Sequence, residues 1–223
     1  MNTKLFFSAV IKFLLGVVLV CALVFIPAGT LNFPGGIIFT CALFVPMLVA
    51  GVVMMVKSPS LLEKRLNAKE KEKEQSVIIK ISGLMFIAGF VVAGLNFRFS
   101  WLRLPLAVNI VASVLFLFGY LLFAEVLREN AYLSRTIEVQ EGQKVVDTGL
   151  YGIVRHPMYS ATLMLFLMMP LMLGSLISFV IFLAYPFIIA ARIKNEEKIL
   201  TEQLDGYKEY KEKVKYRLIP FIW

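Results

Sequence analysis

Long apolar stretches alternate with short polar segments along the whole chain. Crossing the hydrocarbon core of a bilayer takes about 20 consecutive apolar residues in a helix. Six stretches approach or reach this length: residues 5–26, 36–56, 77–97, 104–127, 158–173 and 175–193. The fifth is shorter and contains Pro170, so the last two could form a tight helical hairpin instead of two full crossings. The pattern therefore predicts an all-α, polytopic transmembrane protein with five or six spans.

Composition supports the membrane interpretation. Hydrophobic residues make up 59% of the 223 residues and the mean hydropathy is +0.80, whereas soluble domains are usually about 45–50% apolar. Lipid must therefore cover part of the surface. The two cysteines, Cys21 and Cys41, lie in different apolar stretches without metal-ligand spacing. We expect them to be small packing residues, and we predict no metal site.

The charged residues indicate partners and orientation. The net charge is +8, and the basic residues gather in polar segments that border the apolar stretches, which favours anionic membrane lipids over nucleic acid as partners. Lys and Arg are absent from the connection 27–35, numerous at 57–76, reduced to two at 98–103 and numerous again at 128–156. Because Lys and Arg are enriched in cytoplasmic loops, we predict a multi-pass integral membrane protein with both termini in the cytoplasm.

Two polar segments have helical patterns of their own. In the basic segment 57–76, Ser58 can cap a helix and Pro59 suits its first position, so we expect an interfacial helix there. A solvated connector is the alternative. The tail 192–214 carries apolar residues at helical spacing, and we expect it to form a cytoplasmic amphipathic helix.

Three polar clusters lie beside the predicted spans, where charged side chains are costly. The first is the segment 149–159, GLYGIVRHPMY, with the only histidine of the chain, His156. Pro157 suits the first turn of the fifth span, which places Arg155 and His156 at a helix entrance where free backbone N–H groups favour an anion. A structural histidine and an interfacial arginine are the alternatives.

The second cluster is Arg192-Ile193-Lys194-Asn195-Glu196-Glu197. Arg192 and Glu196 are four residues apart and share a helix face, so they could simply pair with each other. The third cluster combines Gly-Tyr-x-x-Tyr at 206–210 with Arg-x-x-Pro at 217–220. Alone it indicates only an amphipathic helix followed by a terminal turn.

The order and spacing of these clusters resemble a known family. Gly-x-Tyr-x-x-x-Arg-His-Pro-x-Tyr, a helical hairpin, Arg-x-x-x-Glu-Glu, Gly-Tyr-x-x-Tyr and Arg-x-x-Pro follow one another between about 130 and 220. This series is similar to the C-terminal half of the isoprenylcysteine carboxyl methyltransferases and phospholipid methyltransferases. The resemblance implies a membrane methyltransferase whose S-adenosylmethionine pocket is closed by the C-terminal helix. It divides the chain into N-terminal spans, 1–103, and a methyltransferase core, 104–223.

The resemblance also implies roles for individual residues. The cofactor-binding positions are Lys144, Val145, Val146, Tyr151, His156, Pro157, Met158, Tyr159 and Glu196, with Gln143 beside them. Arg155 and Arg192 match catalytic arginines, and Arg192 is expected to face the methyl acceptor. Asn130 matches a substrate-binding asparagine, although the sequence Asn130-Ala131-Tyr132 departs from the Asn-Phe pattern of the family.

The predicted acceptor is a lipophilic molecule with an anionic group. A carboxylate is already a nucleophile and needs no general base, and an arginine can hold it by two parallel hydrogen bonds. Two arginines with a single histidine therefore favour a carboxylate on a prenylated or lipid molecule over an amine. A lipid-soluble acceptor also explains why such an enzyme is embedded in the membrane.

Two other functions stay open at this point. A membrane reductase of the sterol-reductase type would share a related C-terminal architecture and bind NADPH. A non-enzymatic scaffold or transporter subunit is the third reading, although charged residues in transporters gather near the middle of the membrane and here they gather at one border. The chain contains no GxGxxG element, so the usual soluble methyltransferase fold is not indicated.

Overall fold

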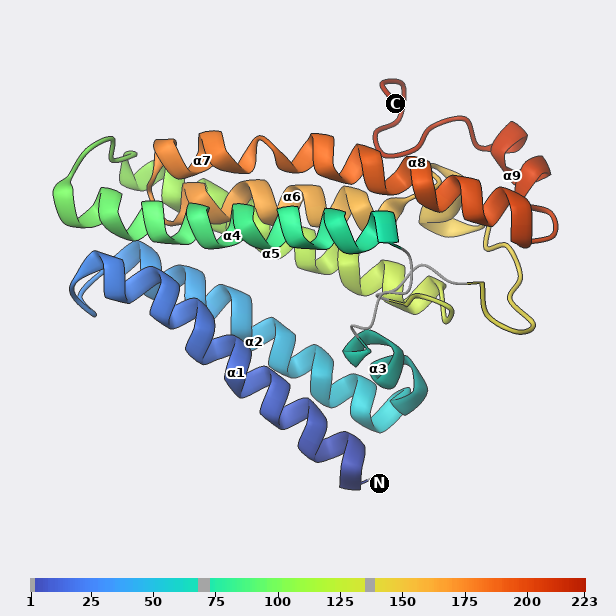
Figure 1. The fold of residues 1–223 in the computed structure, drawn as a ribbon, viewed down its shortest axis with the longest axis horizontal. Helices are drawn as coiled ribbons and strands as arrows, with labels where there is room; N and C mark the ends of the chain where they lie inside the picture. Colours follow the sequence, from blue (N-terminus) through green and yellow to red (C-terminus); the bar gives the residue numbers. More distant parts are fainter. Residues whose placement is uncertain (1–2, 68–72, 135–138) are drawn as a thin grey trace.

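The computed structural model describes residues 3–67, 73–134 and 139–223, and within these ranges helices dominate (Figure 1). The elements, in order, are α1 (Thr3–Ala28), α2 (Pro34–Lys57), α3 (Pro59–Leu66), α4 (Lys73–Phe99), α5 (Leu106–Glu129), the 3-10 helix η1 (Gly149–Gly152), α6 (Pro157–Met172), α7 (Leu176–Phe182), α8 (Tyr185–Gln203) and α9 (Tyr207–Lys213). The predicted all-α class is confirmed.

The apolar helices coincide with the predicted spans. Five segments of the described chain are long and apolar enough to cross a membrane: α1, α2, α4 from Gln75, α5, and the combined α7–α8 segment Leu176–Gln203. The remaining apolar helix, α6, has 16 residues, which is about 24 Å of helix. Large apolar side chains are exposed along α1, α2, α4 and α5, as expected of surfaces that face lipid. The protein is therefore a polytopic membrane protein.

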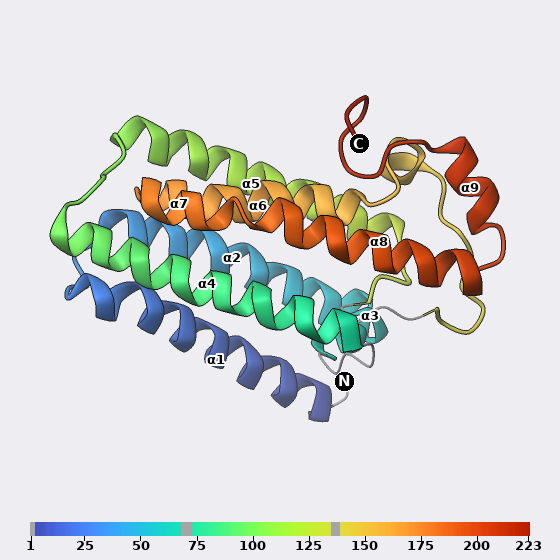
Figure 2. The same cartoon turned by 45° about the horizontal axis from the view of Figure 1, so that its top comes forward.

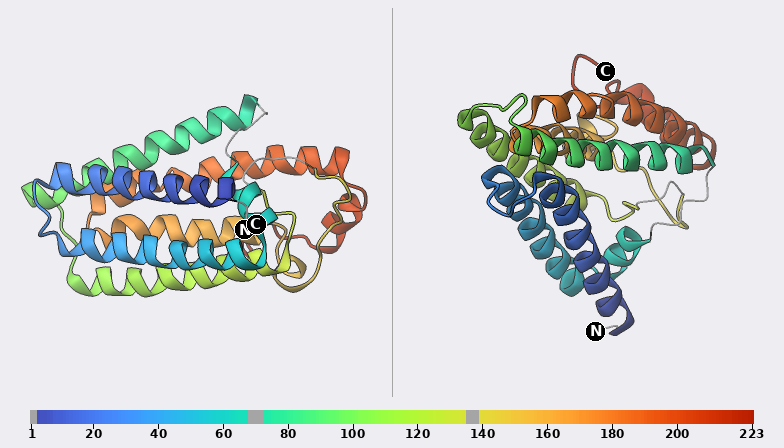
Figure 3. Two further views of the ribbon diagram at one scale, coloured as in Figure 1. Left: turned by 90° about the horizontal axis from the view of Figure 1, so that it is seen from below. Right: turned by 60° about the vertical axis from the view of Figure 1, so that its left-hand side comes forward.

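The helices pack around a centre of aromatic rings. Helix α1 packs against α4, α2 against α5, and α6 against both α5 and α7. The buried rings of Phe39, Phe90, Phe116 and Phe182 come from α2, α4, α5 and α7 and contact one another. Figures 2 and 3 show α1 and α2 beside the other long helices, and in Figure 1 they diverge from α4 toward the N-terminus. The aromatic centre therefore joins α2, α4, α5 and α7.

Glycines allow α4 to approach its neighbours closely. A Cβ atom at Gly94 would lie 2.5 Å from the carbonyl oxygen of Val24 in α1. A Cβ atom at Gly89 would overlap the ring of Phe182. Small residues of this kind let transmembrane helices pack at short distance. They hold α4 between α1 and α7.

The predicted interfacial helix at 57–76 is shorter than expected. Helix α3 ends at Leu66, residues 68–72 lie outside the described ranges, and the chain from Lys73 onward belongs to α4. Pro59 starts the helix as predicted, but Ser58 makes no capping hydrogen bond with its side chain.

Helix α3 also lies against protein and not only at the membrane surface. Leu61 and Leu62 are buried, and Leu61 belongs to a buried apolar cluster with Val126 and Tyr151. This burial of apolar side chains explains why the segment is helical here and is not a solvated connector.

The predicted C-terminal amphipathic helix at 192–214 is divided between two elements. Helix α8 continues the sixth span to Gln203, and α9 begins at Tyr207. The turn between them contains Gly206 with φ of 81°, a left-handed conformation that glycine adopts without strain. A second break, after Phe182, separates α7 from α8. Helices α7 and α8 follow one another along the bundle, and α9 lies beyond the end of α8 (Figure 1).

Both chain termini lie at the end of the bundle that carries α3 and α9 (Figures 1 and 2). The connections after α1, after α4 and after α6 lie at the opposite end. The site described next is at the end that carries the termini.

Candidate functional site

A pocket lies where α8 and α9 meet the connection between α5 and α6. It contains about 830 Å³ of empty space, part of it open to solvent. Its walls are formed by Asn130, Tyr132, Leu133, Ser134, Gln143, Lys144, Val145, Val146, Tyr151, Arg155, His156, Met158, Tyr159, Arg192, Glu196, Leu200, Leu204, Tyr207 and Tyr210. The structure thus brings together every predicted site residue except Pro157. Pro157 is buried at the first position of α6 and does not line the pocket.

The entrance of α6 is held by the C-terminal segment of the chain. His156 is the N-cap residue of α6, as its position before Pro157 predicts. The backbone N–H groups of Arg155 and His156 donate to the carbonyl oxygens of Tyr216 and Arg217 at 2.9 Å each. The bond from His156 gives a partner to one of the N–H groups that the start of a helix leaves unsatisfied, and the bond from Arg155 holds the residue before it.

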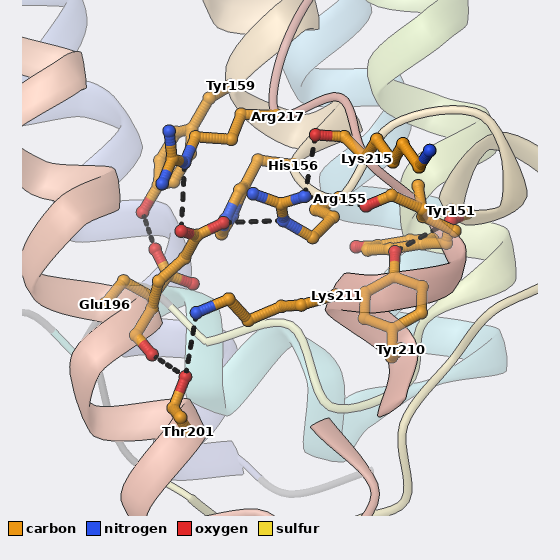
Figure 4. A network of polar contacts seen from close by, with 12 residues as sticks. Tyr151, Arg155, His156, Tyr159, Glu196, Thr201, Tyr210, Lys211, Lys215 and Arg217 are labelled. Atoms are coloured by element: carbon orange, nitrogen blue, oxygen red, sulfur yellow. Dashed lines mark hydrogen bonds and ion pairs between the residues drawn. The ribbon is translucent and has the colours of Figure 1, made fainter. Parts of the chain in front are cut away.

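A buried ion network centred on Glu197 lies behind the pocket. Oε1 of Glu197 accepts a hydrogen bond from Arg155 Nε at 2.7 Å and lies 3.3 Å from His156 Nε2. Oε2 accepts from Arg217 Nε at 2.9 Å. Figure 4 shows that the side chains of Arg155, His156 and Arg217 point toward one another. With Glu197 only 4% exposed, the network ties α6, α8 and the C-terminal segment together.

Arg155 makes further bonds to the main chain. Its Nη1 donates to the carbonyl oxygens of Val214 and Lys215 at 2.6 and 2.9 Å. Arg155 is 7% exposed, and its guanidinium holds the segment after α9 in place. The catalytic role of Arg155 stays a prediction, and its contacts support a positioning role.

A second polar chain faces the pocket and links Glu196 to Arg192. The hydroxyl of Tyr159 donates to Oε2 of Glu196 and accepts from Nε of Arg192 at 2.9 Å. The Tyr159 hydroxyl therefore bridges Arg192 and Glu196, which we expected could pair directly with each other. This chain presents a carboxylate and a guanidinium one helical turn apart along the same wall.

Tyrosine hydroxyls from α9 and η1 complete the wall. Tyr210 donates to the carbonyl oxygen of Tyr151 at 2.7 Å, and Asn130 donates to the Tyr151 hydroxyl at 3.0 Å. The predicted substrate residue Asn130 thus holds Tyr151 in place. The buried hydroxyl of Tyr207 has no hydrogen-bond partner in the described part of the chain. Burial raises the pKa of Tyr207 well above its ordinary value, so this hydroxyl stays protonated and can donate to a ligand.

Gly149, the first residue of the Gly-x-Tyr sequence, is required by a close contact. Glu129 at the end of α5 accepts a hydrogen bond from the N–H of Leu150 at 2.9 Å. A Cβ atom at Gly149 would overlap the Glu129 carboxylate, and the φ of 55° also favours glycine. Glycine here lets the carboxylate cap the short helix that carries Tyr151.

Sequence reasoning missed Glu197, Arg217 and the two α9 tyrosines as site residues. The available signal was the Glu-Glu doublet at 196–197. Successive helical residues point about 100° apart, so two adjacent carboxylates can serve two different environments. The structure shows that Glu196 lines the pocket and that Glu197 lies in the ion network.

A comparison with protein families supports the predicted family resemblance. Residues 110–202 match the family model described as the isoprenylcysteine carboxyl methyltransferase (ICMT) family. The matched segment contains α6, α7, η1 and nearly all of α5 and α8. A search of curated proteins gave no match.

Proposed function

We propose that this membrane methyltransferase of the isoprenylcysteine carboxyl methyltransferase family uses S-adenosylmethionine to methylate a carboxylate on a lipophilic acceptor. The family supports methyl transfer in a membrane. The cofactor and the acceptor are our inference from the pocket.

The arrangement of Glu196, Tyr159 and Arg192 carries the proposal. An anionic group and a cationic group lie one helical turn apart on α8, and the Tyr159 hydroxyl fixes both. A carboxylate attracts a cationic donor, and a guanidinium binds a carboxylate acceptor with charge-assisted hydrogen bonds. We assign Glu196 to the cofactor and Arg192 to the acceptor.

The polarity of the pocket suits a cofactor of this kind, because its walls combine a carboxylate, tyrosine hydroxyls and apolar side chains. The hydroxyl of Tyr207 is buried, protonated and without a partner among the described residues, so a ligand would satisfy it. S-adenosylmethionine would supply a methyl group on a positively charged sulfur. Lys144, Val145, Val146, Met158 and His156 would line its binding site.

The protein would catalyse transfer by exclusion of water and alignment of the two reactants. A carboxylate acceptor needs no proton removed, so the site requires no general base. Alignment of two bound reactants can lower a barrier by about 7–11 kcal/mol at best. We assign Arg192 a direct role with the acceptor, and Arg155 a role in holding the pocket wall through Glu197 and the C-terminal segment.

The acceptor would enter from the bilayer while the cofactor arrives from water. The pocket lies at the end of the helices that also carries both termini. Basic residues of the described chain such as Lys64, Arg65 and Lys144 border this end, whereas the opposite end carries Arg98 and Arg103 at the connection after α4. The rule that Lys and Arg favour cytoplasmic loops supports a cytoplasmic pocket and cytoplasmic termini.

Ligand-dependent thermal unfolding in detergent tests the cofactor assignment. We expect S-adenosylhomocysteine to raise the midpoint of wild-type protein and NADPH to leave it unchanged, because only a ligand that binds the folded state stabilises it. Stabilisation by NADPH alone would support the sterol-reductase alternative and overturn the proposal.

Transfer of a labelled methyl group tests the acceptor assignment. The probes are S-farnesylcysteine, which carries a carboxylate, and phosphatidylethanolamine, which carries an amine. We expect label on S-farnesylcysteine. The variant Glu196→Ala should weaken cofactor binding, and Arg192→Ala should raise the KM for S-farnesylcysteine with little change in cofactor affinity. Lys194→Ala, an exposed cation on the same helix, is the control and should behave as wild type.

A further inference from the structure

Gln75, at the start of α4, is a fully buried amide at the edge of the site. It has 0% exposure and lies outside the segment 110–202 that matches the family. Burial of an amide is costly unless its donors and acceptors find partners. The buried amide of Gln75 therefore requires hydrogen-bond partners, and Arg192 provides them.

Both polar ends of the Gln75 amide contact Arg192. Oε1 of Gln75 accepts a hydrogen bond from Nη1 of Arg192 at 3.1 Å. Nε2 of Gln75 donates to the backbone carbonyl of Arg192 at 3.4 Å. The amide thus fixes the guanidinium relative to its own main chain, while Tyr159 holds Nε from the α6 side.

The chemical nature of these two partners matters for an anionic acceptor. An amide and a hydroxyl restrict the guanidinium without adding a negative charge beside it. A glutamate at position 75 could still accept from Nη1 of Arg192, but it would add a negative charge and could not donate to the Arg192 carbonyl. A free arginine would lose roughly 2 kcal/mol of rotamer entropy when it binds an acceptor, and a guanidinium held in advance loses less.

We propose that Gln75 is a positioning residue that pre-orients Arg192 for the acceptor carboxylate. This inference rests on the proposed function of Arg192. It assigns the N-terminal spans a part in the reaction, because Gln75 of α4 contacts Arg192. We expect the role to concern the acceptor, since Gln75 does not line the pocket itself and reaches it through Arg192.

The same helix offers a matched control at its other end. Asn96 is 1% exposed, and its amide binds the backbone N–H of Leu102 at 3.0 Å and the carbonyl of Leu102 at 3.3 Å. It is also a buried amide bonded to main chain on α4, but it lies at the end remote from the pocket. Loss of either amide should cost similar stability, and only one should affect the acceptor.

The experiment compares Gln75→Leu with Asn96→Leu in purified, full-length protein. Thermal unfolding first establishes that both variants fold and how much each is destabilised. Titration calorimetry then gives the affinity for S-adenosylhomocysteine, and labelled transfer gives kcat and KM for S-farnesylcysteine. We expect Gln75→Leu to raise this KM about tenfold, the size of one hydrogen bond to a charged group, with cofactor affinity within twofold of wild type. Asn96→Leu should leave both constants within twofold.

Two further variants separate positioning from a general structural effect. Gln75→Glu retains the acceptor for Nη1 of Arg192, loses the donor to the Arg192 carbonyl and adds a negative charge, so we expect an increase in KM larger than that of Gln75→Leu. In an Arg192→Lys background, Gln75→Leu should change KM by less than twofold, because Gln75 acts through the guanidinium.

The outcomes distinguish failure of the inference from failure of the proposed function. An active wild type with equal KM values in Gln75→Leu and Asn96→Leu overturns the inference alone. A loss of cofactor affinity in Gln75→Leu as large as its rise in KM also overturns it. A wild type that transfers no methyl group to S-farnesylcysteine overturns the proposed acceptor and the role of Gln75 with it.

Discussion

The two faces of α8 use adjacent glutamates in opposite ways. Glu197 is buried and is held by Arg155, Arg217 and His156. Glu196 is half-buried, lines the pocket and is bonded by the neutral hydroxyl of Tyr159. The first carboxylate has cationic partners from distant parts of the chain, whereas the observed partner of the second leaves its charge uncancelled.

This difference shows that two adjacent residues of one helix can have separate roles, one in stability and one in ligand binding. A buried charge is tolerable only when it is paired, and its removal leaves the partners uncompensated. A carboxylate at a pocket wall with an uncharged partner retains attraction for a cationic ligand. We therefore expect substitutions on the Glu197 face to affect stability, and substitutions on the Glu196 face to affect ligand affinity.

The largest effect is expected for Glu197→Ala. Removal of this carboxylate leaves the buried guanidinium of Arg155 without its ionic partner, which should lower the free energy of unfolding by about 3–5 kcal/mol. Thermal or denaturant unfolding in detergent measures the change. Glu202→Ala, an exposed residue of the same helix, should change stability by less than about 0.5 kcal/mol. Equal destabilisation by the two substitutions would contradict the structural role of Glu197.

Glu196→Gln is expected to weaken cofactor binding while stability changes little. Loss of a charge-assisted contact costs about 2 kcal/mol, or roughly 30-fold in affinity. Calorimetric titration with S-adenosylmethionine and with S-adenosylhomocysteine measures it. If affinity falls more for S-adenosylmethionine than for S-adenosylhomocysteine, Glu196 faces the sulfonium. If the affinity for both compounds falls equally, Glu196 binds another cationic group that both molecules carry. An unchanged affinity for both compounds would remove Glu196 from the cofactor site.

Tyr159→Phe breaks the bridge between Glu196 and Arg192 without loss of the ring. We expect both the cofactor affinity and the acceptor KM to worsen about tenfold, because the hydroxyl positions both groups and one such bond contributes about 1–1.5 kcal/mol. Tyr185→Phe removes a different buried hydroxyl of the same region, one that donates to Thr162 at 2.9 Å. If the control variant loses as much activity as Tyr159→Phe, the bridge has no special role.

The smallest effect is expected for Tyr207→Phe. Because the Tyr207 hydroxyl has no partner among the described residues, its removal should leave stability unchanged or raise it slightly, while cofactor affinity falls about fivefold through a lost bond of about 1 kcal/mol. Tyr210→Phe should instead lower stability, because the Tyr210 hydroxyl donates a hydrogen bond to the carbonyl oxygen of Tyr151. A destabilised Tyr207→Phe with normal cofactor affinity would show that the hydroxyl serves the fold.

Much of this architecture could be predicted from local sequence, because lipid imposes a length on each span. The start of α6 at Pro157 and the placement of Arg155 and His156 at its entrance follow from the same local rules. The break after Phe182 has a local cause that the predicted unbroken stretch 175–193 overlooked: Pro186, at the start of α8, has no N–H to donate to the carbonyl of Phe182 four residues earlier. The separate α9 was missed because the apolar spacing of 192–214 continues across Gly206.

The site was predictable where its residues form a motif and not where it depends on distant partners. The motif 149–159 and Arg192 with Glu196 are brought into one pocket. Glu197 and Gln75 could not be assigned, because their partners lie 20 to 117 residues away along the chain. Such pairs are specified by packing of helices, which periodicity alone does not reveal.

The alkali stability of the transferred methyl group tests the central claim most directly. Membranes that contain the wild-type protein are incubated with methyl-labelled S-adenosylmethionine, and the extracted lipid product is then treated with base. A carboxyl methyl ester releases its label as volatile methanol, whereas a methyl group on nitrogen gives no methanol and stays non-volatile. We predict that the label is volatile in the wild type and strongly reduced in Arg192→Ala. Label that stays non-volatile after base, or that is unchanged in Arg192→Ala, would contradict carboxyl methylation at this pocket.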